Sequence, residues 1–157
     1  MDPREIFMRR AIELARQGML SGAGGPFGAV ITLDGEIIGE GWNRVVATSD
    51  PTAHGEITAI RDACSRRGDF SLAGAEIFTT GQPCPMCLGA IHWARISRIY
   101  YGFRIEDAAT IGFDDREFFE EFARPEGERA IPADDLIRAE ALELIEEYRR
   151  IPDRTPY

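Results

Sequence analysis

The sequence has few of the features that would place a protein outside the cell, in a membrane or on nucleic acid. Its 157 residues include only three cysteines, and no apolar run reaches the roughly 18 residues needed to cross a bilayer. The formal net charge is −9, and no basic stripe that could grip a phosphate backbone is present. These absences disfavour membrane, disulfide-stabilised and nucleic-acid-binding proteins, and they favour a small-molecule substrate.

The amino terminus also lacks the unbroken apolar core of a signal peptide. Its first 18 residues, "MDPREIFMRRAIELARQG", mix charges with apolar residues at helical spacing, which is typical of an amphipathic helix. We therefore expect a cytoplasmic protein. In that reducing compartment a cysteine pair is more often metal-binding or catalytic than a disulfide.

What the sequence does contain is an alternation of strand and helix patterns. Two β-like runs flank Asp34-Gly35, a strong hairpin signal, and "AEIFTT" and "RISRIYYGF" predict two further strands. Helices are predicted at the amino terminus, over about 52–66, and from Pro83 to about Ala94, because proline is tolerated in a first turn. Strands alternating with helices indicate one layered α/β domain with a mixed sheet.

The last third of the chain is less clearly patterned. "DREFFEEF" predicts a short helix, and residues 134–150 have helical spacing although their first part is compatible with an edge strand. No linker divides the chain, so a single domain over residues 1–157 is expected.

Two cysteines and a histidine carry the strongest chemical signal. Cys84 and Cys87 form a C-x-x-C pair at the start of a predicted helix, where they share a face and where the helix favours the thiolate. His54, at the start of another predicted helix, would add a nitrogen ligand. Three such ligands are typical of a catalytic zinc site with a fourth place for water. Glu56 would take and return the protons of that water.

Alternatives exist for each of these residues. A C-x-x-C pair can be a redox centre, and a structural zinc site would need a fourth protein ligand. Cys64 lies about 15 Å along the predicted helix from His54, too far to share its metal ion, and is expected in the core. His92 is expected to lie on a helix face, and Trp93 is expected to pack against the core rather than to act in catalysis. The order H-x-E…P-C-x-x-C, however, is the signature of zinc nucleobase deaminases.

With these motifs the chain resembles the cytidine-deaminase-like superfamily, and within it the bacterial guanine deaminases. The resemblance runs nearly end to end through "GGPFGAVI", "DPTAHGE", "PCPMCLGAIHWAR", "GFDD" and the terminal tyrosine. It implies a three-layer α/β/α fold with a mixed sheet of about five strands and one zinc ion per subunit. It also implies hydrolysis of guanine to xanthine and ammonia in purine salvage or catabolism.

The resemblance assigns further residues to the site. It implies that Phe27 lines the base pocket, that Asn43 hydrogen-bonds the substrate, and that Asp115 accepts hydrogen bonds from purine N–H groups. It also implies homodimers that exchange a C-terminal segment of about 135–157, so that Tyr157 enters the neighbouring active site. Without the resemblance, Phe27 would be a core residue, Asp115 a helix cap and Tyr157 a frayed end.

Two positions depart from the family pattern. Gly55 stands where alanine is common between the zinc histidine and the glutamate, and Gln82 stands where guanine deaminases usually have glutamate. These changes keep open cytosine, an aminotriazine or a guanine-like nucleoside as the substrate. Adenosine in tRNA fits the net charge poorly, and a non-catalytic protein with a structural zinc is the alternative outside the enzymes.

Overall fold

The structure is a computed structural model that describes residues 2–157, and the chain divides into two compact units after Phe119. The elements of the first unit are α1 (Pro3–Leu20), β1 (Gly28–Leu33), β2 (Glu36–Trp42), α2 (Val45–Thr48), α3 (Gly55–Arg67), β3 (Glu76–Gly81), α4 (Pro85–Trp93), β4 (Arg98–Phe103) and α5 (Ile105–Ala109). Helix α6 (Arg116–Ala123) spans the division.

The strands form one mixed sheet in the order β2-β1-β3-β4. Strand β1 pairs antiparallel with both β2 and β3, whereas β3 and β4 run parallel. The predicted hairpin and mixed sheet are confirmed, but the described residues form four strands rather than about five. No strand occurs in 132–137, where Pro132 cannot donate to a ladder and the pair Asp134-Asp135 disfavours extended pairing.

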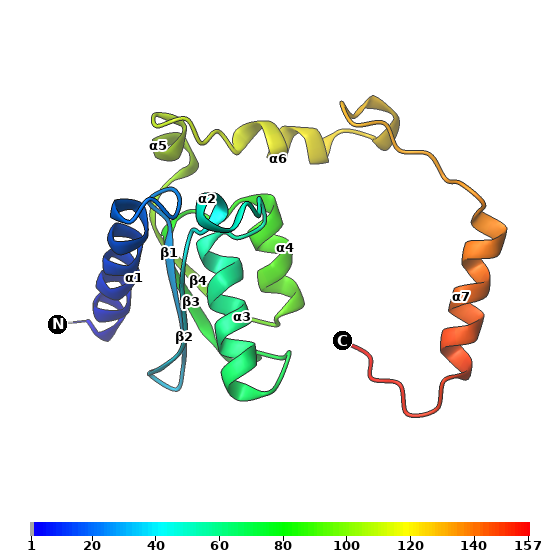
Figure 1. Ribbon diagram of the computed structural model, residues 1–157, viewed down its shortest axis with the longest axis horizontal. Helices are drawn as coiled ribbons and strands as arrows, with labels where there is room; N and C mark the ends of the chain where they lie inside the picture. Colours follow the sequence, from blue (N-terminus) through cyan, green and yellow to red (C-terminus); the bar gives the residue numbers. More distant parts are fainter. Residues whose placement is uncertain (1) are drawn as a thin grey trace. The chain divides into compact units, whose positions relative to one another are not determined.

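Helices cover the sheet on both faces, as Figure 1 shows: α1 lies on one face, and α3 and α4 lie on the other. The alternation along β1 explains these layers, because successive side chains of a strand point to opposite faces. Val30 packs with Leu14 of α1 in one buried cluster, while its neighbours Ala29 and Ile31 pack with Ala59 of α3 in another. The predicted three-layer arrangement is therefore confirmed.

Small residues allow α3 to lie close to the strands. A Cβ added at Gly39 of β2 would stand 2.6 Å from the Cβ of Ala63, and one at Gly41 would stand 2.7 Å from the carbonyl oxygen of Gly55. Both distances are shorter than real Cβ contacts, so only glycine fits. The first turn of α3 is thereby held against the sheet.

The observed bounds of α3 correct the expected start of this helix and confirm its expected end. Helix α3 begins at Gly55 rather than near Thr52, because the Asp50 carboxylate accepts a 2.8 Å hydrogen bond from the Thr52 N–H and holds a turn there. The end is as expected, since Gly68 adopts the left-handed conformation typical of a helix C-terminus. Helices α2 and α5 were not predicted, because four- and five-residue helices show too little periodicity.

The second unit, Glu120–Tyr157, contains the 3₁₀ turn η1 (Glu126–Glu128) and helix α7 (Arg138–Arg150). None of its residues is buried. Helix α7 leaves its apolar side chains Leu142, Ile145 and Tyr148 between 40% and 49% exposed. Among the described helices, none has both the length and the apolar character needed to cross a membrane.

Candidate metal centre

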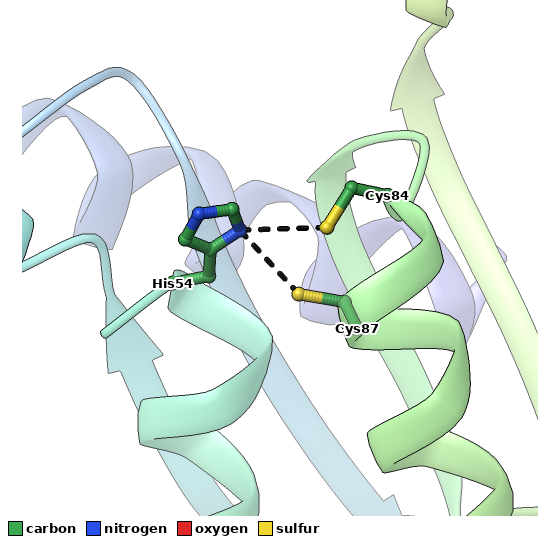
Figure 2. A group of neighbouring side chains, drawn as sticks. All are labelled: His54, Cys84 and Cys87. Carbon is green, nitrogen blue, oxygen red and sulfur yellow. Dashed lines mark hydrogen bonds between the residues drawn. The ribbon is translucent and has the colours of Figure 1, made fainter. Parts of the chain in front are cut away.

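Two helix starts bring three potential metal ligands together. His54 is the N-cap residue of α3, Cys84 is the N-cap residue of α4, and Cys87 lies in the first turn of α4. Nδ1 of His54 lies 3.6 Å from Sγ of Cys84 and 3.5 Å from Sγ of Cys87, and Figure 2 shows the ring and both sulfurs facing one another. The structure therefore brings together the three residues that the sequence predicted as ligands.

The geometry of this group fits a zinc ion. A tetrahedral zinc with Zn–N of about 2.0 Å and Zn–S of about 2.3 Å separates neighbouring N and S ligands by about 3.5 Å. The two observed separations match this edge length, and all three ligand atoms lie within 4.8 Å of one another. One imidazole and two thiol groups are also a donor set typical of zinc.

The remaining cysteine and histidine do not join the group. Cys64 is half-buried further along α3, where it packs against the core cluster that includes Ala59 and Ala63, as expected. His92 is exposed near the end of α4. Within the described residues, then, the group has three protein ligands rather than the four of a closed structural site.

The electrostatics of the group favour a bound cation. Hydrogen bonding from Cys87, and then from His54, lowers the pKa of Cys84 to about 4, against the opposing effect of burial. The same contact with Cys84, together with burial, raises the pKa of Cys87. The lowered pKa favours the thiolate form of Cys84, which is the form that binds a metal ion. The same contact raises the pKa of His54, so without an ion the two side chains are polarised toward thiolate and imidazolium.

Glu56 lies in the first turn of α3, two residues after the histidine, and its side chain is only 7% exposed. Burial raises the pKa of its carboxyl group, and a hydrogen bond from its own backbone N–H is the largest of the effects that oppose the rise. A carboxyl whose pKa moves toward neutrality can both take and return a proton, which is the requirement for a general acid–base.

A pocket of about 220 Å³ opens beside these groups. The predicted site residues that line it are Phe27, Asn43, His54, Glu56, Cys84 and Asp115. Cys87 is fully buried next to it, and Tyr157 belongs to the second unit, where it is 74% exposed. The fold thus gathers every predicted site residue of the first unit around one cavity.

Asn43 is held so that its amide can donate into the pocket. Its side chain is 5% exposed, and Oδ1 accepts a 3.1 Å hydrogen bond from the Val45 N–H. The Nδ2 group is left to donate. Gly24 makes room for this arrangement, because a Cβ at that position would overlap Oδ1 of Asn43.

The apolar wall of the pocket is built from phenylalanines. The rings of Phe27 and Phe113 meet edge to face with centroids 5.0 Å apart, and Phe103 contacts Phe27 at 5.7 Å. Phe113 was not singled out in the sequence, although it stands in the "GFDD" motif from which Asp115 was chosen. Phe27 therefore contributes to the pocket as well as to aromatic packing.

Asp115 is the last residue of the same motif, and it lines the pocket. The side chain that caps the start of α6 is that of Asp114, which accepts a 3.2 Å hydrogen bond from the Arg116 N–H. Partial burial, and then the negative charge of Cys84, raise the pKa of Asp115. Its carboxylate offers hydrogen-bond acceptors to a ligand in the pocket.

Comparison with known proteins identifies the family of this chain. Residues 1–103, which include the three potential ligands and Glu56, match the family model described as the cytidine and deoxycytidylate deaminase zinc-binding region. The chain belongs to the cytidine and deoxycytidylate deaminase family. A zinc-binding deaminase domain therefore accounts for the first two thirds of the chain.

Several relatives match over longer stretches. The guanine deaminase of Bacillus subtilis is 45% identical over 98% of both chains, and its crystal structure superimposes with a TM-score of 0.93. The guanine deaminase structure from Nitrosomonas europaea is 30% identical, with a TM-score of 0.66 over 92% of this chain and 84% of that one. The tRNA-specific adenosine deaminase of Haemophilus influenzae is 41% identical over 71% of this chain and 67% of its own.

Proposed function

We propose that this protein is a zinc-dependent guanine deaminase that hydrolyses guanine to xanthine and ammonia. The observation that carries the proposal is the match to the Bacillus subtilis guanine deaminase over 98% of both chains. The tRNA-specific relatives support the reaction class but match over shorter stretches, and the net charge of −9 fits tRNA binding poorly.

His54, Cys84 and Cys87 hold one zinc ion per subunit in this proposal, supported by the matching edge lengths and by the low pKa of Cys84. When bound, zinc acts as a Lewis acid that lowers the pKa of water to about 7. The two helix N-termini that carry these residues add positive electrostatic potential, which favours thiolate ligands.

Glu56 moves the protons. It takes one proton from the attacking water, whose oxygen adds to C2 of guanine, and passes that proton to the adjacent ring nitrogen. It then takes the remaining proton from the new hydroxyl group on C2 and passes it to the amino group, which leaves as ammonia while the C2 carbonyl forms. Its burial beside the ligands and its raised pKa support this role. The products are xanthine and ammonia, and no further reactant is needed.

The pocket walls recognise the base. Asn43 donates from Nδ2 to a ring acceptor, Asp115 accepts hydrogen bonds from N–H groups, and the aromatic rings of Phe27 and Phe113 pack on the base. Guanine has both acceptors and N–H donors on its rim, so this mixture of groups suits it.

A homodimer is the second part of the proposal. The C-terminal segment of about 135–157 packs on a second copy, and Tyr157 enters the active site of that copy. The exposed apolar side chains of α7 and of Tyr157 support this arrangement, because such residues are normally buried in an interface. The dimer acts on a small nucleobase in the cytoplasm, within purine salvage or catabolism.

The test is ammonia release by the zinc-loaded protein from guanine, guanosine, adenine, cytosine and an aminotriazine. We expect release from guanine alone, with xanthine as the product. Release from cytosine or the triazine instead would show that the substrate is another small heterocycle. Gly55 and Gln82, which depart from the guanine deaminase pattern, would then be the first residues to test for substrate preference. If no base releases ammonia and a gel shift shows tRNA binding, the results would favour a tRNA adenosine deaminase. If no base releases ammonia and tRNA does not bind, they would favour a non-catalytic protein with a structural zinc site.

A further inference from the structure

Thr80 is a buried residue of β3 whose hydroxyl group joins that strand to the segment before β1. Its Oγ1 donates a 3.1 Å hydrogen bond to the carbonyl oxygen of Pro26 and accepts one of 3.1 Å from the backbone N–H of Gly28. The residue is only 5% exposed. A hydroxyl group can donate and accept at once, so this one side chain satisfies two backbone groups that are distant from it in the sequence.

The residue between those two partners is Phe27, which lines the base pocket. Its own backbone groups are engaged as well. The N–H of Phe27 donates a 2.8 Å hydrogen bond to the carbonyl of Gly25, and its carbonyl accepts one of 2.8 Å from the N–H of Asn43. Four consecutive backbone groups on and beside Phe27 therefore have partners, and Thr80 supplies two of the four.

The end of β3 also makes room for the Phe27 ring. A Cβ added at Gly81 would stand 2.6 Å from a ring carbon of Phe103 and 3.2 Å from one of Phe27. The first distance is shorter than real Cβ contacts, so glycine leaves the space that these rings need. Thr80 thus holds the backbone beside Phe27, while the next residue of the strand accommodates its ring.

We propose that Thr80 is a positioning residue for substrate binding, which acts by holding Phe27 in the pocket wall. The inference rests on the proposed function, in which the Phe27 ring packs on the base. Without the hydroxyl group, the buried N–H of Gly28 and the carbonyl of Pro26 would lose their partners. Unpaired backbone groups are costly, so the segment would shift toward other partners and carry the ring with it.

The same geometry separates binding from chemistry. The two hydrogen bonds of Thr80 involve neither the potential metal ligands nor Glu56. A shifted Phe27 ring would therefore weaken contact with the base in the ground state and in the transition state alike. Loss of such uniform binding raises KM and leaves kcat nearly unchanged.

Thr80→Val tests this role, because valine has the shape of threonine but no hydroxyl group. We expect T80V to raise KM for guanine about tenfold and to change kcat less than about twofold. Thr80→Ser keeps the hydroxyl group and should keep KM near that of wild type. Thr32→Val is the matched control, a buried threonine at the other end of β1 from Gly28, and its KM should stay near that of wild type. Zinc content and Tm are measured for every variant, so that a folding defect is visible.

A second substitution shows whether Thr80 acts through Phe27. Phe27→Ala removes the ring that Thr80 is proposed to position, so T80V should raise KM by less than about threefold in that background. An equal rise of KM with and without the Phe27 ring would overturn the inference. So would an unchanged KM in T80V that folds and binds zinc.

The hydrogen bond to Gly28 can be followed without any substrate by amide hydrogen exchange. The Gly28 N–H should exchange faster in T80V than in wild type, whereas T80S and T32V should leave its rate nearly unchanged. Equal protection of Gly28 in T80V and wild type would overturn the inference. If the wild-type protein releases no ammonia from guanine, it is the proposed function that fails. The KM comparison is then made with the base of the panel that does release ammonia.

Discussion

At the scale of single residues, the pocket contains two buried polar side chains, Glu56 and Asn43, whose surroundings suit them to different roles. Glu56 is buried beside the potential ligands with a raised pKa, which suits a group that exchanges protons. Asn43 is equally buried, but its oxygen is engaged by the Val45 N–H and only its donor remains. In the proposed mechanism we therefore expect Glu56 to act on kcat and Asn43 on substrate binding.

Glu56→Gln tests the first task. The amide has the shape of the carboxylate but cannot accept the proton of water, so we expect kcat to fall by about 10²–10⁴. Zinc content, measured by elemental analysis, should be unchanged because Glu56 is not among the ligands of the proposal. Near-normal turnover in the zinc-loaded variant would remove Glu56 from the mechanism.

Gly24→Ala tests the second task. The added Cβ would overlap Oδ1 of Asn43 and turn its amide away from the pocket. We expect KM for guanine to rise about tenfold, as for a lost hydrogen bond, while kcat and zinc content change little. Gly89→Ala is the control, since nothing lies within 4 Å of a Cβ there. Equal KM values in the two variants would contradict the assigned role of Asn43.

The residues whose chemistry lies in short local motifs were the ones that sequence could predict. H-x-E and P-C-x-x-C place His54, Glu56, Cys84 and Cys87 on two helix starts, because a few residues decide where a helix begins. The close contact of Asn43 with Gly24 and the position of the Phe113 ring against Phe27 involve segments that are distant in the sequence. No local pattern predicts such contacts, so these features required the structure.

At the scale of elements, the decisive contact is the one between α3 and the sheet. Gly55, which departs from the alanine of the family pattern, packs so tightly that a Cβ would stand 3.0 Å from the carbonyl oxygen of Phe27. Gly41 approaches the same turn of α3 from β2. These two glycines set the position of His54 and Glu56 on either side of Gly55.

Gly41→Ala should therefore disturb both stability and the metal site. Overpacking of this kind costs about 1–3 kcal/mol, which corresponds to several degrees of Tm for a protein of this size. We expect the Tm to fall and the zinc affinity, measured by competition with a chelating dye, to weaken because α3 is displaced. Gly89→Ala should instead stabilise the protein by up to about 1 kcal/mol, since alanine favours a helix. Unchanged Tm and zinc affinity in Gly41→Ala would contradict the positioning role of this contact.

Element prediction from sequence succeeded where side-chain pattern and turn chemistry agree. The Asp34-Gly35 hairpin is confirmed, and so is the helix predicted from Pro83 to about Ala94, which is observed over Pro85–Trp93. The helical spacing at Leu142 and Ile145 is confirmed by helix α7. The described residues form four strands rather than about five, because the segment before α7, which was compatible with an edge strand, is not a strand. A weak edge strand and the start of a helix share too similar a pattern to be separated locally.

At the scale of the whole molecule, the proposed dimer predicts that each active site needs two chains. Deletion of the last few residues, including Tyr157, should abolish guanine deamination because the neighbouring site loses that side chain. Zinc content and Tm should change little, since Tyr157 is 74% exposed and none of residues 120–157 is buried. Normal turnover by the truncated protein would remove Tyr157 from the site.

Mixing two inactive variants shows whether the C-terminal segment completes the active site of the partner chain or that of its own chain. A dimer of one truncated chain and one Glu56→Gln chain contains one site with an intact Glu56 and an intact tail from the partner. We expect activity to return to about a quarter of wild type after co-refolding, if the chains assort at random. No recovery, although mixed dimers are demonstrated by differential tagging, would contradict the exchange.

The most direct test of the account as a whole is the origin of the oxygen in the product. Guanine is incubated with the zinc-reconstituted protein in ¹⁸O-labelled water, and the purine is analysed by mass spectrometry alongside ammonia. We predict xanthine that carries one labelled oxygen, one ammonia for each xanthine, and loss of both when the protein is first stripped with a chelator. Unlabelled xanthine, no xanthine, or equal turnover after chelation would contradict zinc-dependent hydrolytic deamination of guanine.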